Sequence, residues 1–327
     1  MGPILSKTVM APVNNHENTD PWVLPQLDFR VEDLSHPGAK LFFRQIPNPY
    51  DAIKRAVEAS WKWLYGWNES SDIQHGKNSQ MPVVTPPLAL IDSVRRVKRI
   101  TLTIRPMDGV AYTFGSDDGS EKEVHFSLNH IVNSHKGDTE IKKDIRVREE
   151  ILGVLVHEIV HCYQYNGQGT APGGLIEGIA DCVRLHEKLS PPHWKRAPPK
   201  GKHVPEPDGK WVWDWNWDAG YERTAYFLDW IDTTSETWPN SPYTRQKNPE
   251  PNAMSSTRSA PPPSASSIPI QISPATLSPS RPLGKGLFFR ALNARLKDAK
   301  WSSEMDLFLE LTNWPRDALW EAYCAGN

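Results

Sequence analysis

This chain of 327 residues has few cysteines, no long apolar run and no excess of charge of one sign. Its three cysteines, Cys162, Cys182 and Cys324, do not suit a disulfide framework, and we expect the first two to be small core residues. No apolar run approaches the length of a membrane span, which is about 18 residues. Lys plus Arg number 37 against 39 for Asp plus Glu, so charge gives no reason to expect a nucleic-acid partner.

Compositional bias along the chain predicts its organisation. Residues 1–27 show no periodicity and no signal-like apolar segment, so they predict a flexible N-terminus and, on this ground alone, a cytoplasmic protein. Residues 234–283 are rich in Ser, Pro, Thr and Asn, and their few apolar side chains cannot offset the entropy of ordering. We therefore expect a disordered insertion there, between a main domain at 28–233 and C-terminal helices at 284–327 that pack on the same domain.

Hydrophobic periodicity predicts an α+β fold. Three short runs rich in β-branched and aromatic residues are separated by turn residues and predict a small, mostly antiparallel sheet; they are RVKRITLTI, VAYTF and EVHFSL, at 96–104, 110–114 and 123–128. Apolar residues at helical spacing predict helices at 49–66, 149–165 and 174–189, and again in the C-terminal region.

The segment HEIVH has the spacing of a zinc site. His157 and His161 lie four residues apart, so a helix brings both imidazoles to one face, with Glu158 beside them. From this composition, HExxH is expected by chance roughly 0.02 times in the chain. The surrounding helix is apolar nearly all round and must be buried, so its polar side chains need partners. A Zn²⁺ ion would provide one.

A catalytic zinc needs a third protein ligand, which EGIAD can supply. Glu177 and Asp181 lie four apart on the second predicted helix, and the glycine-rich loop before it permits a sharp return. We prefer Glu177 as the ligand and Asp181 as acceptor for a ligand imidazole N–H, with the reverse assignment as the alternative. His186 faces elsewhere on this helix, and we expect it at the surface.

The whole stretch HEIVHCYQYNGQGTAPGGLIEGIADCVRLH resembles the signature of the plant basic secretory protein family, HExxHxxQxxGxGxxPGGLxEGxADxVRL. Further matches are PGAKLFFRQI, EVHFSLNHI, WDAGYERTAYFLDW and the C-terminal FFRALN, LFLELT and LWEAY. The resemblance covers nearly everything from residue 28 except the Pro/Ser-rich insertion. It implies a zincin-like, gluzincin-type metallopeptidase, secretion, and a role in defence or protein turnover.

With zinc in place, we expect Glu158 to act as general base toward water in peptide hydrolysis. Tyr221 is a candidate donor to the oxyanion, with a buried packing role as the alternative. The strand 124–128 could align an extended peptide substrate through its edge. His125 and His130 fit packing or surface roles better than metal ligation.

A second reading is a catalytically inactive, zinc-containing defence or carbohydrate-binding protein. Four tryptophans at period two, Trp211, Trp213, Trp215 and Trp217, would share one face of an extended segment and could stack on sugar or peptide, although packing onto the domain is the commoner role. Retention of Glu158 favours the enzyme, because a purely structural zinc site has no use for a base. We expect a peptide or protein substrate; the sequence does not set the oligomeric state.

Overall fold

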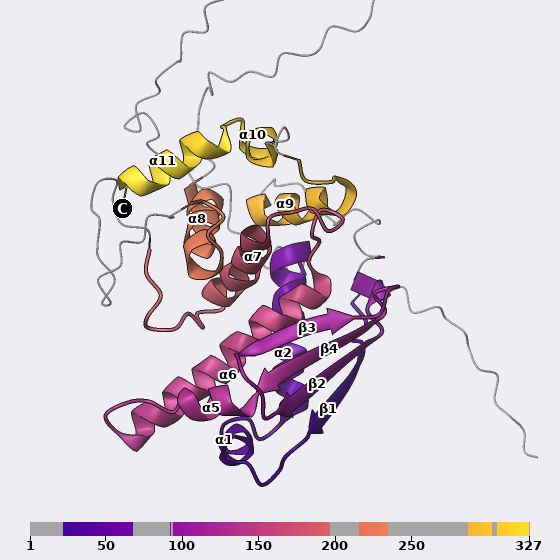
Figure 1. The fold of residues 1–327 in the computed structure, drawn as a ribbon. Helices are drawn as coiled ribbons and strands as arrows, with labels where there is room; N and C mark the ends of the chain where they lie inside the picture. The colour runs from indigo at the N-terminus through magenta and orange to yellow at the C-terminus, as the bar shows by residue number, and fades with distance from the viewer. Residues whose placement is uncertain are drawn as a thin grey trace, which may run out of the picture.

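The computed structural model describes residues 22–67, 92, 94–196, 216–234, 287–302 and 306–326. The predicted flexible N-terminus and Pro/Ser-rich insertion fall mainly outside these ranges, as do Trp211, Trp213 and Trp215. The described segments combine one four-stranded sheet with a set of helices, so the predicted α+β class is confirmed (Figure 1).

The sheet is mixed, with the order β1-β2-β4-β3. Its strands are β1 (Gln26–Val31), β2 (Arg99–Arg105), β3 (Ala111–Gly115) and β4 (Glu121–Ser127). β2 runs parallel to both of its neighbours, β1 and β4, and only β3 and β4 are antiparallel. The prediction of a mostly antiparallel sheet is therefore wrong. The chain leaves β2, forms β3 at the sheet edge and returns as β4 between them, which the turn residues alone do not reveal.

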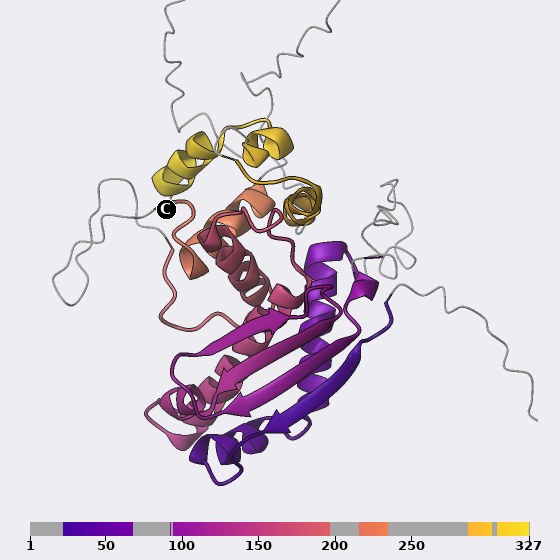
Figure 2. The same ribbon diagram turned by 45° about the vertical axis from the view of Figure 1, so that its right-hand side comes forward.

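Two long helices, α2 (Pro49–Tyr65) and α6 (Glu140–Tyr163), pack against each other and lie behind the sheet in Figure 2. α2 matches its prediction, because the Asn48 side chain caps its first turn and Gly66 ends it in the left-handed conformation. α6 begins at Glu140, nine residues before the prediction. Its first turns are largely exposed and polar, and the Thr139 side chain caps them by accepting from the Lys142 amide.

The remaining helices extend from the end of α6 away from the sheet, except for two short ones beside it (Figure 1). The two beside the sheet are α1 (Pro37–Gln45) and α5 (Leu128–Asn133). The others are α7 (Gly173–His186), α8 (Tyr221–Thr234), α9 (Leu287–Asp298), α10 (Leu307–Thr312) and α11 (Arg316–Gly326). α9 packs against α2 and α8, and α11 also contacts α8.

The contact between α7 and α8 depends on a small residue. A Cβ atom built at Gly178 would lie 2.3 Å from Cγ2 of Thr224, so any side chain there would push the helices apart. α8 begins at Tyr221. The close packing of α8 against α7 therefore determines where the Tyr221 side chain lies.

Buried apolar residues from the sheet and helices join in one core, which includes Cys162 and Cys182 at 4% and 0% exposure. Both thiols are free, which confirms the expected packing role. Within the described part of the chain, no helix has both the length and the apolar content needed to span a membrane.

Candidate metal centre

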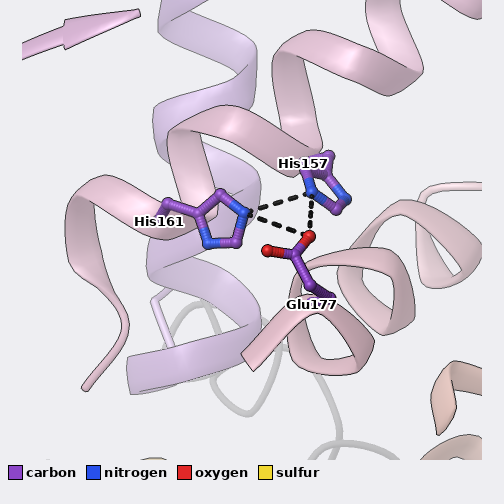
Figure 3. A group of neighbouring side chains, drawn as sticks. All are labelled: His157, His161 and Glu177. Carbon is purple, nitrogen blue, oxygen red and sulfur yellow. Dashed lines mark hydrogen bonds and ion pairs between the residues drawn. The ribbon is translucent and has the colours of Figure 1, made fainter. Parts of the chain in front are cut away.

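The two histidines of α6 and one glutamate of α7 converge on a common point (Figure 3). Nε2 of His157 lies 3.1 Å from Nε2 of His161 and 3.1 Å from Oε2 of Glu177, and the remaining separation, from His161 Nε2 to Glu177 Oε2, is 3.7 Å. These are the only residues among the described ones that form such a group of three potential ligands.

The spacing and chemistry of these three atoms fit zinc. Ligand atoms that lie about 2.0–2.1 Å from a tetrahedral Zn²⁺ are separated from each other by about 3.3 Å, which falls between the observed distances. Two imidazole nitrogens and one carboxylate oxygen are also a donor set that zinc enzymes use, with a fourth position left for water or substrate. The residues present therefore fit the ion that the sequence predicts.

A metal bound at Nε2 of His157 requires the ring proton on Nδ1, and Asp181 provides the acceptor for that proton. The imidazole Nδ1 lies 2.7 Å from Oδ1 of Asp181, which is one turn after Glu177 on α7. Because the carboxylate can only accept, Nδ1 carries the proton and donates it. Asp181 is 3% exposed and lies behind His157 rather than at the point of convergence, so the geometry favours Glu177 over Asp181 as the third ligand.

The electrostatics of the site favour a cation. Burial lowers the pKa of His157, but hydrogen bonds to Asp181 and Glu177 outweigh burial and raise that pKa to about 10. Burial raises the pKa of Glu177, and hydrogen bonds from His157 and His161 outweigh it and hold that pKa well below its usual range. Without metal, a proton thus supplies the positive charge that these carboxylates attract.

Gln164, the residue that ends α6, touches the second histidine. Its Nε2 lies 3.0 Å from Nδ1 of His161 and 3.2 Å from the carbonyl of Ile176, while its Oε1 is buried without a hydrogen-bond partner. A half-turn of this amide would place Oε1 against Nδ1, where it accepts the N–H that metal binding through Nε2 requires. The turn would give up the bond to the Ile176 carbonyl, which accepts only from the amide nitrogen.

Glu158 is largely buried and is held by the sheet. It is 5% exposed, and the hydroxyl of Thr113 on β3 donates to its Oε2 over 2.6 Å. This hydrogen bond holds Oε2 of Glu158 in place. The other carboxylate oxygen, Oε1, receives no hydrogen bond from Thr113. Thr113 could not be found from the sequence, because the contact joins residues 45 positions apart and depends on β3 packing against α6.

Tyr221 lies beside His157, at the start of α8. Its ring stacks against that of His157 at a centroid distance of 6.3 Å, and it is 55% exposed, so the alternative of a buried packing tyrosine does not hold. Its φ of 46° is strained for a residue with a side chain, as is typical of functional sites. The charge of Glu177, followed by burial, raises the pKa of Tyr221, so its hydroxyl keeps its proton at neutral pH.

A cleft of about 720 Å³ runs past these residues. One wall is formed by residues 110–113, which lead into β3; among the described strands β3 pairs only with β4 and thus presents a free edge. The predicted template, 124–128, lies in β4, whose two edges are taken by β2 and β3. The expected free edge at 124–128 is therefore absent, because sequence does not show which strand of the hairpin lies outermost.

The other singled-out residues lie in structural contacts. His125 stacks on Tyr112 at 4.9 Å and His130 bonds to Glu150 at 2.9 Å, so both avoid the point of convergence as expected. His186 is not at the surface as predicted: its side chain is fully buried, 3.0 Å from Asp229, because α8 covers that face of α7. Trp217 is 9% exposed, which fits a packing role for this one tryptophan of the four.

A comparison with known protein families matches most of this region to one family. A family model described as a peptidase of plants and bacteria, abbreviated BSP, matches residues 24–238. The range contains the sheet, α6, α7 and α8, and so every residue described above around the cleft. No curated protein and no solved structure matches the chain.

Proposed function

This chain belongs to the BSP family of plant and bacterial peptidases, and we propose that it hydrolyses peptide bonds with a zinc ion held by His157, His161 and Glu177. The observation that carries the proposal is the convergence of these three ligand atoms at separations of 3.1–3.7 Å at the wall of an open cleft. A bound Zn²⁺ would supply a Lewis acid there, which polarises a carbonyl and makes water more acidic.

In this proposal Glu158 is the general base. It follows His157 directly in the sequence and lines the same cleft, and its hydrogen bond from Thr113 holds the carboxylate in one orientation. It would take a proton from the attacking water and pass it to the departing amine. A purely structural zinc site would not need a buried acid at this position, which argues against the reading as an inactive binding protein.

Two further elements would serve the substrate. The free edge of β3 offers backbone groups to an extended peptide, and this mode of recognition depends on main chain more than on side chains. Tyr221, with its protonated hydroxyl, would donate a hydrogen bond to the oxygen that becomes negative when the carbonyl is attacked.

The test is a comparison of zinc content and peptide hydrolysis in matched variants. Glu158→Gln should bind as much zinc as the wild type and lose hydrolysis of a broad peptide library by about 10²- to 10⁴-fold. Glu149→Gln, which alters an exposed glutamate on the same helix, is the control and should change neither. A wild-type protein that binds zinc and cleaves no peptide, with chelator-treated protein indistinguishable from it, would refute the proposal.

A further inference from the structure

The cleft is also lined by part of a cluster of charged side chains that the proposed zinc chemistry does not use. Glu150 of α6 accepts hydrogen bonds at 2.9 Å from His130, Arg146 and Arg184. Three of these four residues line the cleft, namely His130, Glu150 and Arg184, whereas Arg146 does not. The two arginines and one glutamate leave a positive charge in excess.

The Arg184 guanidinium is held in place from several sides. Its Nε donates to the carbonyl of Leu189 over 3.0 Å, Nη2 donates to Glu150, and its plane lies over the Trp194 ring with Cζ 5.2 Å from the ring centroid. The third guanidinium nitrogen, Nη1, donates to none of the described residues. The contacts already restrict the conformational freedom of the Arg184 side chain, so a further hydrogen bond from Nη1 would cost little conformational entropy.

A glycine on the facing helix makes room for this arrangement. A Cβ atom built at Gly153 of α6 would lie 2.4 Å from Nε of Arg184, so the guanidinium can cross α6 here only because the side chain is absent. Thus α6 contributes both the acceptor, Glu150, and the gap that lets Arg184 reach the cleft wall.

The cluster lies within reach of a bound peptide. Glu150 precedes His157 by seven residues on α6, and Arg184 follows Glu177 by seven on α7, so each helix places it two turns from a proposed zinc ligand. Seven residues of helix span about 10 Å. An extended peptide covers that distance in about three residues.

From this arrangement we propose that Arg184 forms a carboxylate-binding subsite, which selects substrates with a negative charge within about three residues of the bond that is cleaved. The inference rests on the proposed peptidase function and specifies its substrate class. The carboxylate can be an acidic side chain or the free C-terminus of a short peptide, since both match the fork of an arginine. Glu150 positions the guanidinium, and His130 bonds to the other oxygen of Glu150.

The experiment uses the zinc-loaded protein and blocked peptide pairs that differ only by Glu or Gln, with the pair placed in turn at each of three residues on either side of the cleaved bond. A parallel set carries a free or an amidated C-terminus. The wild type should prefer the charged member at one position by roughly 10- to 100-fold in kcat/KM, and the set in which this occurs identifies the source of the carboxylate.

Arg184→Gln should abolish this preference and retain cleavage of the uncharged peptide. Arg146→Gln is the matched control, because it removes an arginine that bonds to the same glutamate oxygen at the same distance but lies outside the cleft lining. It should retain the preference. If Arg184→Gln does not fold, Gly153→Ala displaces the guanidinium without removing it and should reduce the preference as well.

Failure of the subsite and failure of the peptidase function give different results. Cleavage with equal kcat/KM for charged and uncharged peptides at every position would overturn the subsite alone. No cleavage would overturn the peptidase function, and the subsite is then tested by fluorescence anisotropy of the labelled Glu and Gln peptides, where tighter binding of the charged peptide by wild type than by Arg184→Gln supports it. Equal affinity of both proteins for both peptides overturns it.

Discussion

Nδ1 of His157 lies 2.7 Å from Oδ1 of Asp181, and this one contact connects α6 to α7 behind the proposed zinc ligands. It sets the imidazole tautomer and orientation, and it is buried on both sides. Such partners of metal-binding histidines commonly contribute 10- to 100-fold to metal affinity. We therefore expect Asp181 to increase zinc affinity without being a zinc ligand.

Replacement of Asp181 tests this role. Asp181→Ala should weaken zinc binding by roughly 10- to 100-fold in competition with a chromophoric chelator. Asp232→Ala is a suitable control, since Asp232 is also fully buried and accepts hydrogen bonds from the Phe288 and Phe289 amides far along the chain. That variant should lower thermal stability but bind zinc as the wild type does; equal losses of zinc affinity in both variants would contradict the specific role of Asp181.

The hydroxyl of Thr113 should matter for turnover and not for metal binding. Thr113→Val keeps the shape of the side chain but removes the donor to Glu158, so we expect kcat to fall by about tenfold with zinc affinity unchanged. Thr113→Ser keeps the hydroxyl and should remain close to wild type. Steady-state kinetics on one cleaved peptide distinguishes the variants, and a Thr113→Val enzyme with normal kcat would show that the hydrogen bond does not position the base.

Tyr221 should contribute to the transition state through its hydroxyl alone. Tyr221→Phe keeps the ring against His157, and we expect kcat to fall by roughly 10- to 10²-fold while KM and zinc content stay near wild type. Tyr226→Phe, on the same helix but outside the cleft lining, is the control. A drop in zinc content for Tyr221→Phe would instead assign the residue to the metal site.

The Glu150 cluster should make stability depend on pH. Burial raises the pKa of Glu150, but the hydrogen bond from His130 and the charges of Arg184 and Arg146 outweigh it and hold that pKa well below its usual range. A lowered folded pKa stabilises the protein above the unfolded value of about 4.3, and this contribution disappears as pH falls through the folded value. Glu150→Gln should therefore lower the free energy of unfolding by about 3 kcal/mol at pH 7.

Denaturant unfolding at a series of pH values checks this dependence. The difference between wild type and Glu150→Gln should be constant from pH 5 to 7 and shrink below about pH 4. The exposed Glu149→Gln should show almost no difference at any pH. A gap that widens as the solution becomes acidic would contradict the direction of the Glu150 pKa shift.

Local sequence rules were enough for much of the candidate metal centre. Helical spacing alone put His157 and His161 on one face of α6, and the same rule separated Glu177 from Asp181 by one turn of α7. The structure brings the two faces together, because the glycine-rich loop folds back with Gly167 and Gly169 in the left-handed region. The family assignment followed from the same short segment.

What the sequence could not supply depends on strand order and on contacts between distant elements. The parallel pairing of β2 with β4 places β3 at the edge, and only then does Thr113 meet Glu158. α8 was not predicted, so the burial of His186 against it was missed. Arg184 likewise reads as an ordinary polar residue of α7 until α6 packs against it.

The most direct test of the account is X-ray absorption at the zinc edge on protein loaded with one equivalent of Zn²⁺. We expect two imidazole nitrogens and a carboxylate oxygen at about 2.0–2.2 Å, no sulfur, and loss of this pattern in Glu177→Ala. A sulfur shell at about 2.3 Å, or a spectrum unchanged by Glu177→Ala, would place the ion elsewhere and contradict the account.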